Sequence, residues 1–504
     1  MAKFKRYDYS QKFFIPISLE DQLMPGTLEF VIHTLVENRL DMTVFEARYN
    51  NDQTGRFAYD PKILLKVILL GYSRGLYSSR SIERACKENV IFMALTCQTC
   101  PDHSTIAAFV SSAKEEIPSL FTDVLLVCEE ENLLGGTFFA LDGCKLPSNA
   151  SIFKSGKISD LAKKRDNLQQ KVQGLIEQQI AADRKDKDQM KPGDFFDQKK
   201  RRQQIEVLQK KAKRIEQWLE QNEAKIGRQG REIKSNITDN ESGTMVSSHG
   251  TIQGYNGQVL VDDNHQVIVQ AEVFGEGQDF NHLEPLIDGA KANMKAIGHG
   301  EDYFEGTILT ADALYHSSKS LKKCKAEGID AYIPDKNYRK RDPGLKIKQG
   351  HGAKGIKRLN IDDFRHDEDS DVYKCPHGNI LKRISKRIYD DVIYHQYVAD
   401  KGSCDGCEVK FRCISKSGKR KWLNVPVGRV PGNLTKAMIE KIDTAHGKKI
   451  YKRRFSIVEP VFGNIRSQKR LDRFTLRGKI KVNVQWLLYC MVHNMEKIMN
   501  YGTA

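Results

Sequence analysis

The chain has 504 residues, more than one ordinary hydrophobic core organises, which predicts two to four structural units. Hydrophobic residues make up 39% of the sequence, yet no apolar run reaches the ~20 residues that span a bilayer, and the N-terminus lacks a signal-peptide pattern. We therefore expect a cytoplasmic protein with no membrane partner. Lysine and arginine number 81 against 65 acidic residues, and this net charge of +16 favours nucleic acid as a partner, although an enzyme with a basic surface has the same balance.

The first quarter of the chain is expected to be mainly helical. Residues 61–72 begin with a helix-starting proline and carry a dense apolar face. Shorter helices are predicted at residues 78–84 and 102–109, where Asp102 or Ser104 can cap the second helix. Small consecutive helices with basic residues between them are typical of a helix-turn-helix DNA reader, and a plain helical bundle fits as well.

A strand is predicted at residues 137–141, ending at Asp142. From residue 154 to 233 the chain is rich in lysine, glutamine and glutamate, with apolar residues at helical spacing. Residues 192–194 (Pro-Gly-Asp) divide this segment, which predicts an antiparallel helical hairpin. Its charges most simply form a solvated face.

Strand signals return after this arm. Three further strands are predicted, at residues 255–261, 266–271 and 307–311. The segment 262–264 (Asp-Asp-Asn) is typical of a hairpin turn between the first two strands. Asp312 directly follows the third, and a helix is predicted after it. Strands followed by helices indicate an α/β layer in which one edge of a sheet presents acidic residues.

Glu459 stands in a mainly basic, helix-compatible segment, residues 451–473, whose other acidic residue, Asp472, lies near its end. A carboxylate among so many cations is expected to be ionised and available to hold a metal ion against a phosphate. Asp142 and Asp312, each at the end of an apolar strand, would complete a metal-binding triad.

Each carboxylate also has a structural interpretation. An aspartate before a glycine, as at Asp142, is commonly a turn residue, and Asp312 can cap the helix that follows it. Glu459 can belong to a surface ion pair, which contributes only ~0–1 kcal/mol. Asp262 and Asp263 are competing acidic residues that fit the hairpin turn better.

Several segments, in this order, resemble bacterial insertion-sequence transposases of the DDE type, in the branch with a cysteine cluster before the final glutamate. The matching segments are residues 101–105, 142–143, 254–258, 311–317 and 458–466. The resemblance implies an α+β protein in which an N-terminal helical module joins a split ribonuclease H-like α/β catalytic domain. A helical-hairpin arm and an inserted subdomain would interrupt that domain.

The resemblance also implies domain boundaries. We expect a helical, DNA-binding module at 1–130, a first catalytic part at 131–334 interrupted by the arm at 154–233, a cysteine-bearing insertion at 335–450, and closing catalytic helices at 451–504.

The implied activity is metal-dependent DNA strand cleavage and strand transfer during transposition. Asp142 would bridge two Mg²⁺ (or Mn²⁺) ions, Asp312 would hold one and Glu459 the other. The implied partners are the terminal inverted repeats of the element and its target DNA, bound by a homodimer or larger assembly at the bacterial nucleoid. Two alternatives remain: a transposase-derived DNA-binding protein without activity, and a metal-dependent nuclease that cuts without joining.

By the same resemblance, a tyrosine and an arginine before Glu459, Tyr451 and Arg454, and a basic residue after it, Arg466, would contact DNA at the cleavage site. Arg466 lies seven residues after Glu459, close to two helical turns, so both can project to one face. Arg454 lies five residues before Glu459 where the widespread motif has four, so either of the two basic residues before Arg454 is an alternative. Generic solvated side chains are the plainer interpretation.

The eleven cysteines are an odd number without a secretory signal, which argues against a disulfide scaffold. Four of them cluster near one another: Cys375, Cys404, Cys407 and Cys413. Four thiolates suit a closed, structural Zn²⁺ site, with His377 as a substitute ligand, and reduced thiols without metal are the alternative.

Overall fold

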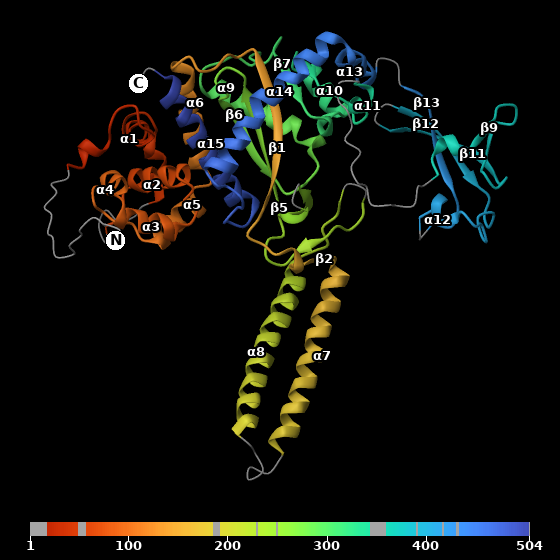
Figure 1. Ribbon diagram of the computed structural model, residues 1–504, viewed down its shortest axis with the longest axis horizontal. Coiled ribbons are helices and arrows are strands. Elements are labelled where there is room, and N and C mark those ends of the chain that lie inside the picture. Colours follow the sequence, from red (N-terminus) through yellow and green to blue (C-terminus); the bar gives the residue numbers. More distant parts are fainter. Residues whose placement is uncertain are drawn as a thin grey trace, which may run out of the picture.

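The computed structural model describes residues 18–48, 57–184, 192–227, 230–247, 250–342, 359–389, 392–415, 418–429 and 433–502. The fold mixes helices with three sheets and confirms the α+β class. Figure 1 shows a central sheet with a group of N-terminal helices on one side, a separate small sheet on the other, and a two-helix arm extending away from both. Within the described residues, no helix is both long enough and apolar enough to cross a bilayer.

The N-terminal part consists of short helices packed on one another. They are α1 (Leu28–Asn38), α2 (Pro61–Ser73), α3 (Ser79–Glu88), α4 (Val90–Leu95), α5 (His103–Ser112) and α6 (Glu116–Glu130). Of the two expected caps, Asp102 is the one used: its carboxylate accepts hydrogen bonds from the amides of Ser104 and Thr105 at 2.8 and 3.0 Å. The C-terminal helix α15 (Lys479–Tyr501) packs against α1, α2, α5 and α6. This helix therefore joins the N-terminal part to the central sheet in one hydrophobic core.

The central sheet carries both predicted aspartates. Its strands are β1 (Phe138–Pro147), β4 (Gly243–Ser247), β5 (Gly250–Asp262), β6 (Ile268–Phe274), β7 (Ile308–Ala311) and β8 (Asp330–Tyr332). The order is β4-β5-β1-β7-β8, and β6 also pairs with β5. Strand β1 is antiparallel to β5 and parallel to β7, which is parallel to β8. The hairpin predicted between β5 and β6 is confirmed by the antiparallel pairing of Val261 with Ile268.

The predicted end of the first strand at Asp142 is wrong, because β1 continues to Pro147. Its parallel partner β7 stops at Ala311, but β5 keeps pairing along the other edge, from Asp142 opposite Val259 to Pro147 opposite Gly254. Asp142 therefore lies in the middle of a strand whose neighbour on one side has ended.

Helices cover the central sheet. They are α9 (Leu283–Ala296), α10 (Ser318–Ala326), α13 (Leu434–Asp443), α14 (Ala445–Gly463) and α15. Helix α14 contacts β1, β7 and β5, and in Figure 1 it runs across the sheet directly beside β1. Helix α9 contacts β6 and β5. A short helix, α11 (Tyr338–Arg341), precedes residues outside the described range.

The arm consists of α7 (Ile158–Asp183) and α8 (Pro192–Gln221), which pack along each other and extend from the end of the sheet (Figure 1). A two-stranded ribbon of β2 (Ser155–Gly156) and β3 (Ser235–Asn236) closes the base of the arm. Helix α8 begins at Pro192, where a proline suits the first helical turn because its missing N–H has no partner there anyway. Residues 185–191 lie outside the described range.

The small sheet is five-stranded and antiparallel, in the order β13-β12-β11-β10-β9. Its strands are β9 (Arg365–Asp367), β10 (Val372–Lys374), β11 (Ile380–Tyr389), β12 (Val392–Ala399) and β13 (Trp422–Arg429), with a short helix α12 (Lys410–Cys413). It has a hydrophobic core of its own, separate from the main core.

Candidate active site

Asp142 and Asp312 are neighbours because of strand pairing. Leu141 on β1 is opposite Ala311 on β7 in parallel register, so the two aspartates occupy the next position on adjacent strands. Adjacent strands lie about 4.8 Å apart, which brings the two carboxylates within reach of each other. Each aspartate directly follows an apolar run in the sequence, and the parallel register brings the two together.

The two carboxylates repel each other in a buried environment. Burial, and secondly the nearby Asp142 carboxylate, raise the pKa of Asp312 from 3.8 to about 6. Burial also raises the pKa of Asp142, against the lowering effect of the Arg454 guanidinium. Asp312 has a structural task as well: it caps the turn at Ala313–Tyr315 by accepting a hydrogen bond from the Leu314 amide at 2.7 Å.

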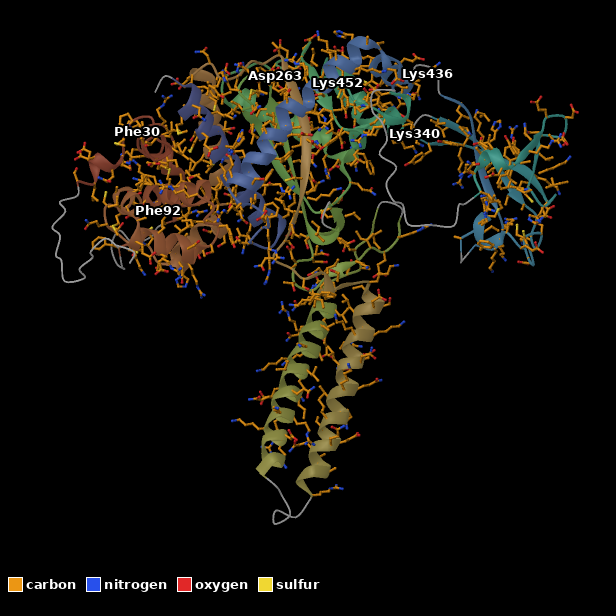
Figure 2. All side chains as sticks on the ribbon, in the orientation of Figure 1. Phe30, Phe92, Asp263, Lys340, Lys436 and Lys452 are labelled. Atoms are coloured by element: carbon orange, nitrogen blue, oxygen red, sulfur yellow. The ribbon has the colours of Figure 1, made fainter. Side chains whose placement is uncertain are left out.

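Arg454 supplies the positive charge at this pair. Its side chain comes from the buried face of α14, is 6% exposed, and donates from Nη1 to Asp142 Oδ2 at 2.5 Å. The guanidinium also lies 4.7 Å from the Phe455 ring centroid. The alternatives to Arg454 lie elsewhere: Arg453 pairs with Asp263, and Lys452 is exposed on α14 (Figure 2).

Glu459 does not join this group of side chains. It lies five residues after Arg454, which corresponds to about 140° around an α-helix, away from the buried face of α14. Its side chain is exposed and forms no hydrogen bond or ion pair with any residue that the structure describes. Helix α14 contains Pro460 and is followed by a π-helical turn, Asn464–Gln468, so its backbone is irregular immediately after Glu459.

Tyr451 lies on α14, and Arg466 lies in the π-helical turn that follows this helix. Tyr451 is buried beside Arg454 and meets the Tyr338 ring edge-on at 5.5 Å, and burial raises its pKa. Arg466 lies in the π-helical turn, is partly exposed, and lines a cavity of about 380 Å³ together with Ser467 and Arg470. Its guanidinium Nε is buried without a hydrogen-bond partner among the described residues.

A buried polar network behind the aspartates escaped sequence analysis. The Gln258 amide donates to Asp279 Oδ1 at 2.8 Å, and its carbonyl accepts a hydrogen bond from the Tyr315 hydroxyl. Asn256 also donates to Asp279. Tyr315 belongs to the turn that Asp312 caps, so the network ties β5 to the Asp312 turn.

Gly143 makes this network possible. A Cβ at position 143 would overlap the Gln258 amide nitrogen and lie 2.7 Å from its Cδ. The available sequence signal was the polar pair Asn256 and Gln258 inside an otherwise buried strand, since buried polar groups require partners.

The four clustered cysteines line one small cavity, of about 20 Å³, in the core of the small sheet. Cys404 is buried, and Cys375 and Cys413 pack against that core. Burial raises the pKa of the Cys413 thiol, and the other three thiols raise it further. The four sulfur atoms therefore lie near one another.

The two aspartates suit magnesium better than they suit a metal ion whose ligands all come from protein side chains. Within the described ranges, no group of three or more His, Cys, Asp or Glu side chains is arranged to hold a metal ion. Magnesium, however, usually binds one or two carboxylates and completes its shell with water and substrate phosphate oxygens. Asp142 and Asp312, two oxygen donors whose charges repel, match that requirement.

Two models of known protein families match parts of the chain. A family model described as a transposase DDE domain matches residues 374–499, and a transposase domain model (DUF772) matches residues 17–112. Neither match includes Asp142 or Asp312. No curated protein and no solved structure matches the chain. Together the two matches indicate an insertion-sequence transposase of the DDE type, which confirms the family resemblance seen in the sequence.

Replacing Gly143 by alanine should lower the free energy of unfolding by about 1–3 kcal/mol, because the methyl group displaces the Gln258 amide from Asp279 and Tyr315. Urea unfolding measures the effect. Gly463→Ala is the matched control, since a Cβ there meets nothing within 4 Å and replaces a helical glycine. Equal stability of the two variants would show that the network does not occupy the space over Gly143.

Stability should also depend on pH through Asp312. Because its pKa is higher in the folded than in the unfolded protein, Asp312 stabilises the fold fully below about pH 3.8, and this contribution is lost as the pH rises through about 6. Asp312→Asn, which stays neutral, should therefore melt at a higher temperature than the wild type near pH 7 and at a similar temperature near pH 4. Thermal melts across that range measure the difference. A difference that does not change with pH would contradict this assignment.

Proposed function

We propose that this protein moves its own element by cutting DNA strands and joining the freed 3′ ends to new phosphates. The observation that carries the proposal is the half-buried pair of Asp142, on β1, and Asp312, directly after the parallel strand β7, beside the basic helix α14. The transposase family matches support the same activity class.

We propose further that the central sheet is ribonuclease H-like. Its support is the sheet order, in which β5 runs antiparallel to a parallel group formed by β1, β7 and β8, with helices packed on the sheet. The proposed organisation keeps the expected boundaries: a DNA-binding module at 1–130, catalytic parts at 131–334 and 451–504, the arm at 154–233, and the insertion at 335–450.

The carboxylates would hold the metal ions, and Arg454 would hold the substrate. Divalent ions at Asp142 and Asp312, Mg²⁺ or Mn²⁺, would activate the attacking oxygen and stabilise the leaving oxygen at phosphorus. Arg454 neutralises Asp142 in this structure and would be released toward a DNA phosphate when the carboxylates acquire other positive partners. Its planar guanidinium suits bidentate contact with phosphate.

Glu459 would complete the triad only after a change in α14. Its present direction on the helix leaves it outside the aspartate pair, so we propose that DNA binding reorients the end of α14 around Pro460 and the π-helical turn. Arg466 in that turn, with its unpaired Nε, would contact a phosphate and couple DNA binding to this change. Tyr451, packed beside Arg454, would orient that arginine toward the cleavage site.

DNA is the proposed partner, as terminal inverted repeats and target DNA, and two copies of the protein would bring the two ends together. The exposed position of Glu459 is the one observation that favours the alternative, a DNA-binding protein derived from a transposase without catalysis. Magnesium-dependent nicking of element-end DNA by the purified protein separates the two, and strand-transfer products separate transposition from simple nuclease activity.

Asp142→Asn, Asp312→Asn and Glu459→Gln should each abolish nicking and joining while DNA binding persists, because each removes a ligand charge at nearly constant volume. Cleavage of labelled element-end DNA with magnesium is the measurement, and gel mobility shift without metal checks binding. Asp263→Asn, in the turn next to β5, is the matched control and should retain activity. Substantial cleavage by the Glu459→Gln protein would remove Glu459 from the site.

We also propose that the cysteine cavity binds one structural Zn²⁺ through Cys375, Cys404, Cys407 and Cys413. The support is that all four thiols line a single cavity of about 20 Å³ inside the small sheet's core. The thiols would give up their protons on binding zinc. Four thiolates suit a closed structural zinc site.

Elemental analysis of protein purified without chelator should give close to one zinc per chain, and Cys404→Ser should release it and expose residues 359–429 to proteases. Cys97→Ser, an exposed cysteine elsewhere, is the control and should keep the zinc. A metal-free wild type with a protease-resistant small sheet would rule out the zinc site.

A further inference from the structure

The small sheet has two unlike faces. One face, here the covered face, carries buried side chains and lies under the cysteine segment: Tyr373, Leu381, Tyr397, Leu423 and Val425, with Ile414 and the cysteines packed on them. The opposite face, here the open face, has no such cover among the described residues. Its composition can be derived from the strand register, because directly opposed residues share a face.

Four rows of opposed residues make up most of the open face. They are Arg365–Lys374–Ile380, then Asp367–Val372–Lys382–Val398–Trp422, then Ser385–Gln396–Asn424, and then Arg387–Tyr394–Pro426, with Tyr389 opposite Val392 at the end of the sheet. A register shift after Arg383 on β11 places Arg387 and Tyr389 on this face. The face therefore combines basic and aromatic side chains with one acidic residue and one row of neutral polar residues.

Three large side chains on this face are strongly exposed, whereas Val398 is buried. Trp422 is 47% exposed, Tyr389 76% and Ile380 41%. Large apolar side chains at such exposure on one face usually mark a binding surface. The Arg420 guanidinium lies 5.3 Å from the Trp422 ring centroid, so one side of the indole already has a planar cation stacked on it.

The charge on the open face selects the kind of partner. Four cations stand on it, namely Arg365, Lys374, Lys382 and Arg387. Two have acidic partners, Lys374 with Asp367 at 2.9 Å and Lys382 with Asp400 at 3.1 Å. Neither arginine forms an ion pair with another residue in the part of the chain that the structure describes. This surplus of positive charge on the open face suits a polyanionic partner.

A polyanion that also fits exposed rings is a nucleic-acid strand with unpaired bases. Phosphates spaced along the strand match the spaced cations, and free bases can stack on indole and phenol rings. A double helix offers the same phosphates but keeps its bases stacked inside, so it would leave Trp422 and Tyr389 exposed.

We propose that the open face binds single-stranded DNA through base stacking on Trp422 and Tyr389 and phosphate contacts from Arg387 and its neighbouring cations. This inference rests on the proposed function, because strand cleavage and transfer at an element end is the step that supplies an unpaired DNA strand. The small sheet would thus hold the displaced strand away from the carboxylates.

The test uses the full-length protein in magnesium-free buffer and a fluorescein-labelled single-stranded oligonucleotide of mixed sequence. Trp422→Ala should weaken binding roughly 5- to 150-fold, the range for one stacked base. Arg387→Ala should reduce the slope of log affinity against log salt by about 0.7. The matched control is Phe411→Ala with Lys410→Ala, an exposed aromatic and a cation on α12, on the side of the covered face.

Tryptophan fluorescence provides a second readout without changing the face. The chain has three tryptophans, and Trp486 is fully buried, so Trp422 becomes the accessible fluorophore in a Trp218→Phe protein. Single-stranded DNA should quench it, and duplex DNA of the same sequence should not. Unchanged affinity of the Trp422→Ala protein, or an equal loss for duplex DNA, would overturn the proposal. Loss of magnesium-dependent nicking with single-strand binding intact would instead overturn the proposed function alone.

Discussion

The parallel pairing of β1 with β7 is the constraint on which the site depends. Because Leu141 lies opposite Ala311, two carboxylates meet at neighbouring positions in a buried environment, where their charges repel. Such a pair needs compensating positive charge, and in this structure Arg454 provides it from α14. The protein thus holds the two carboxylates that we propose are catalytic through an internal ion pair, which a metal ion and a phosphate would replace.

The surrounding fold serves this pair in specific ways. The absence of a side chain at Gly143 admits the Gln258 amide, which links Asp279 to Tyr315 and so fixes the turn that Asp312 caps. Helix α15 packs on both the sheet and the N-terminal helices, so a DNA-reading module would be joined rigidly to the catalytic centre. The small sheet lies apart in Figure 1 and has its own core, which suits a module that handles a DNA strand separately.

Sequence reasoning located β1, β5, β6 and β7 and several helices, because apolar runs and caps are local signals, but it predicted no strand of the small sheet. It ended β1 too early, since only the pairing with β5 carries that strand past Asp142. It could not find the Gln258–Asp279–Tyr315 network, whose members come together only in three dimensions. The five-residue spacing of Arg454 and Glu459 did carry information: it turns Glu459 away from the face that Arg454 occupies, and the structure has this arrangement.

Anomalous diffraction from crystals of the protein with cleaved element-end DNA and Mn²⁺ tests the central claim most directly. The account predicts a manganese peak between the Asp142 and Asp312 carboxylates, with Arg454 moved from Asp142 to a DNA phosphate. A peak elsewhere, or an Arg454–Asp142 ion pair that persists in the metal-bound and DNA-bound complex, would contradict it.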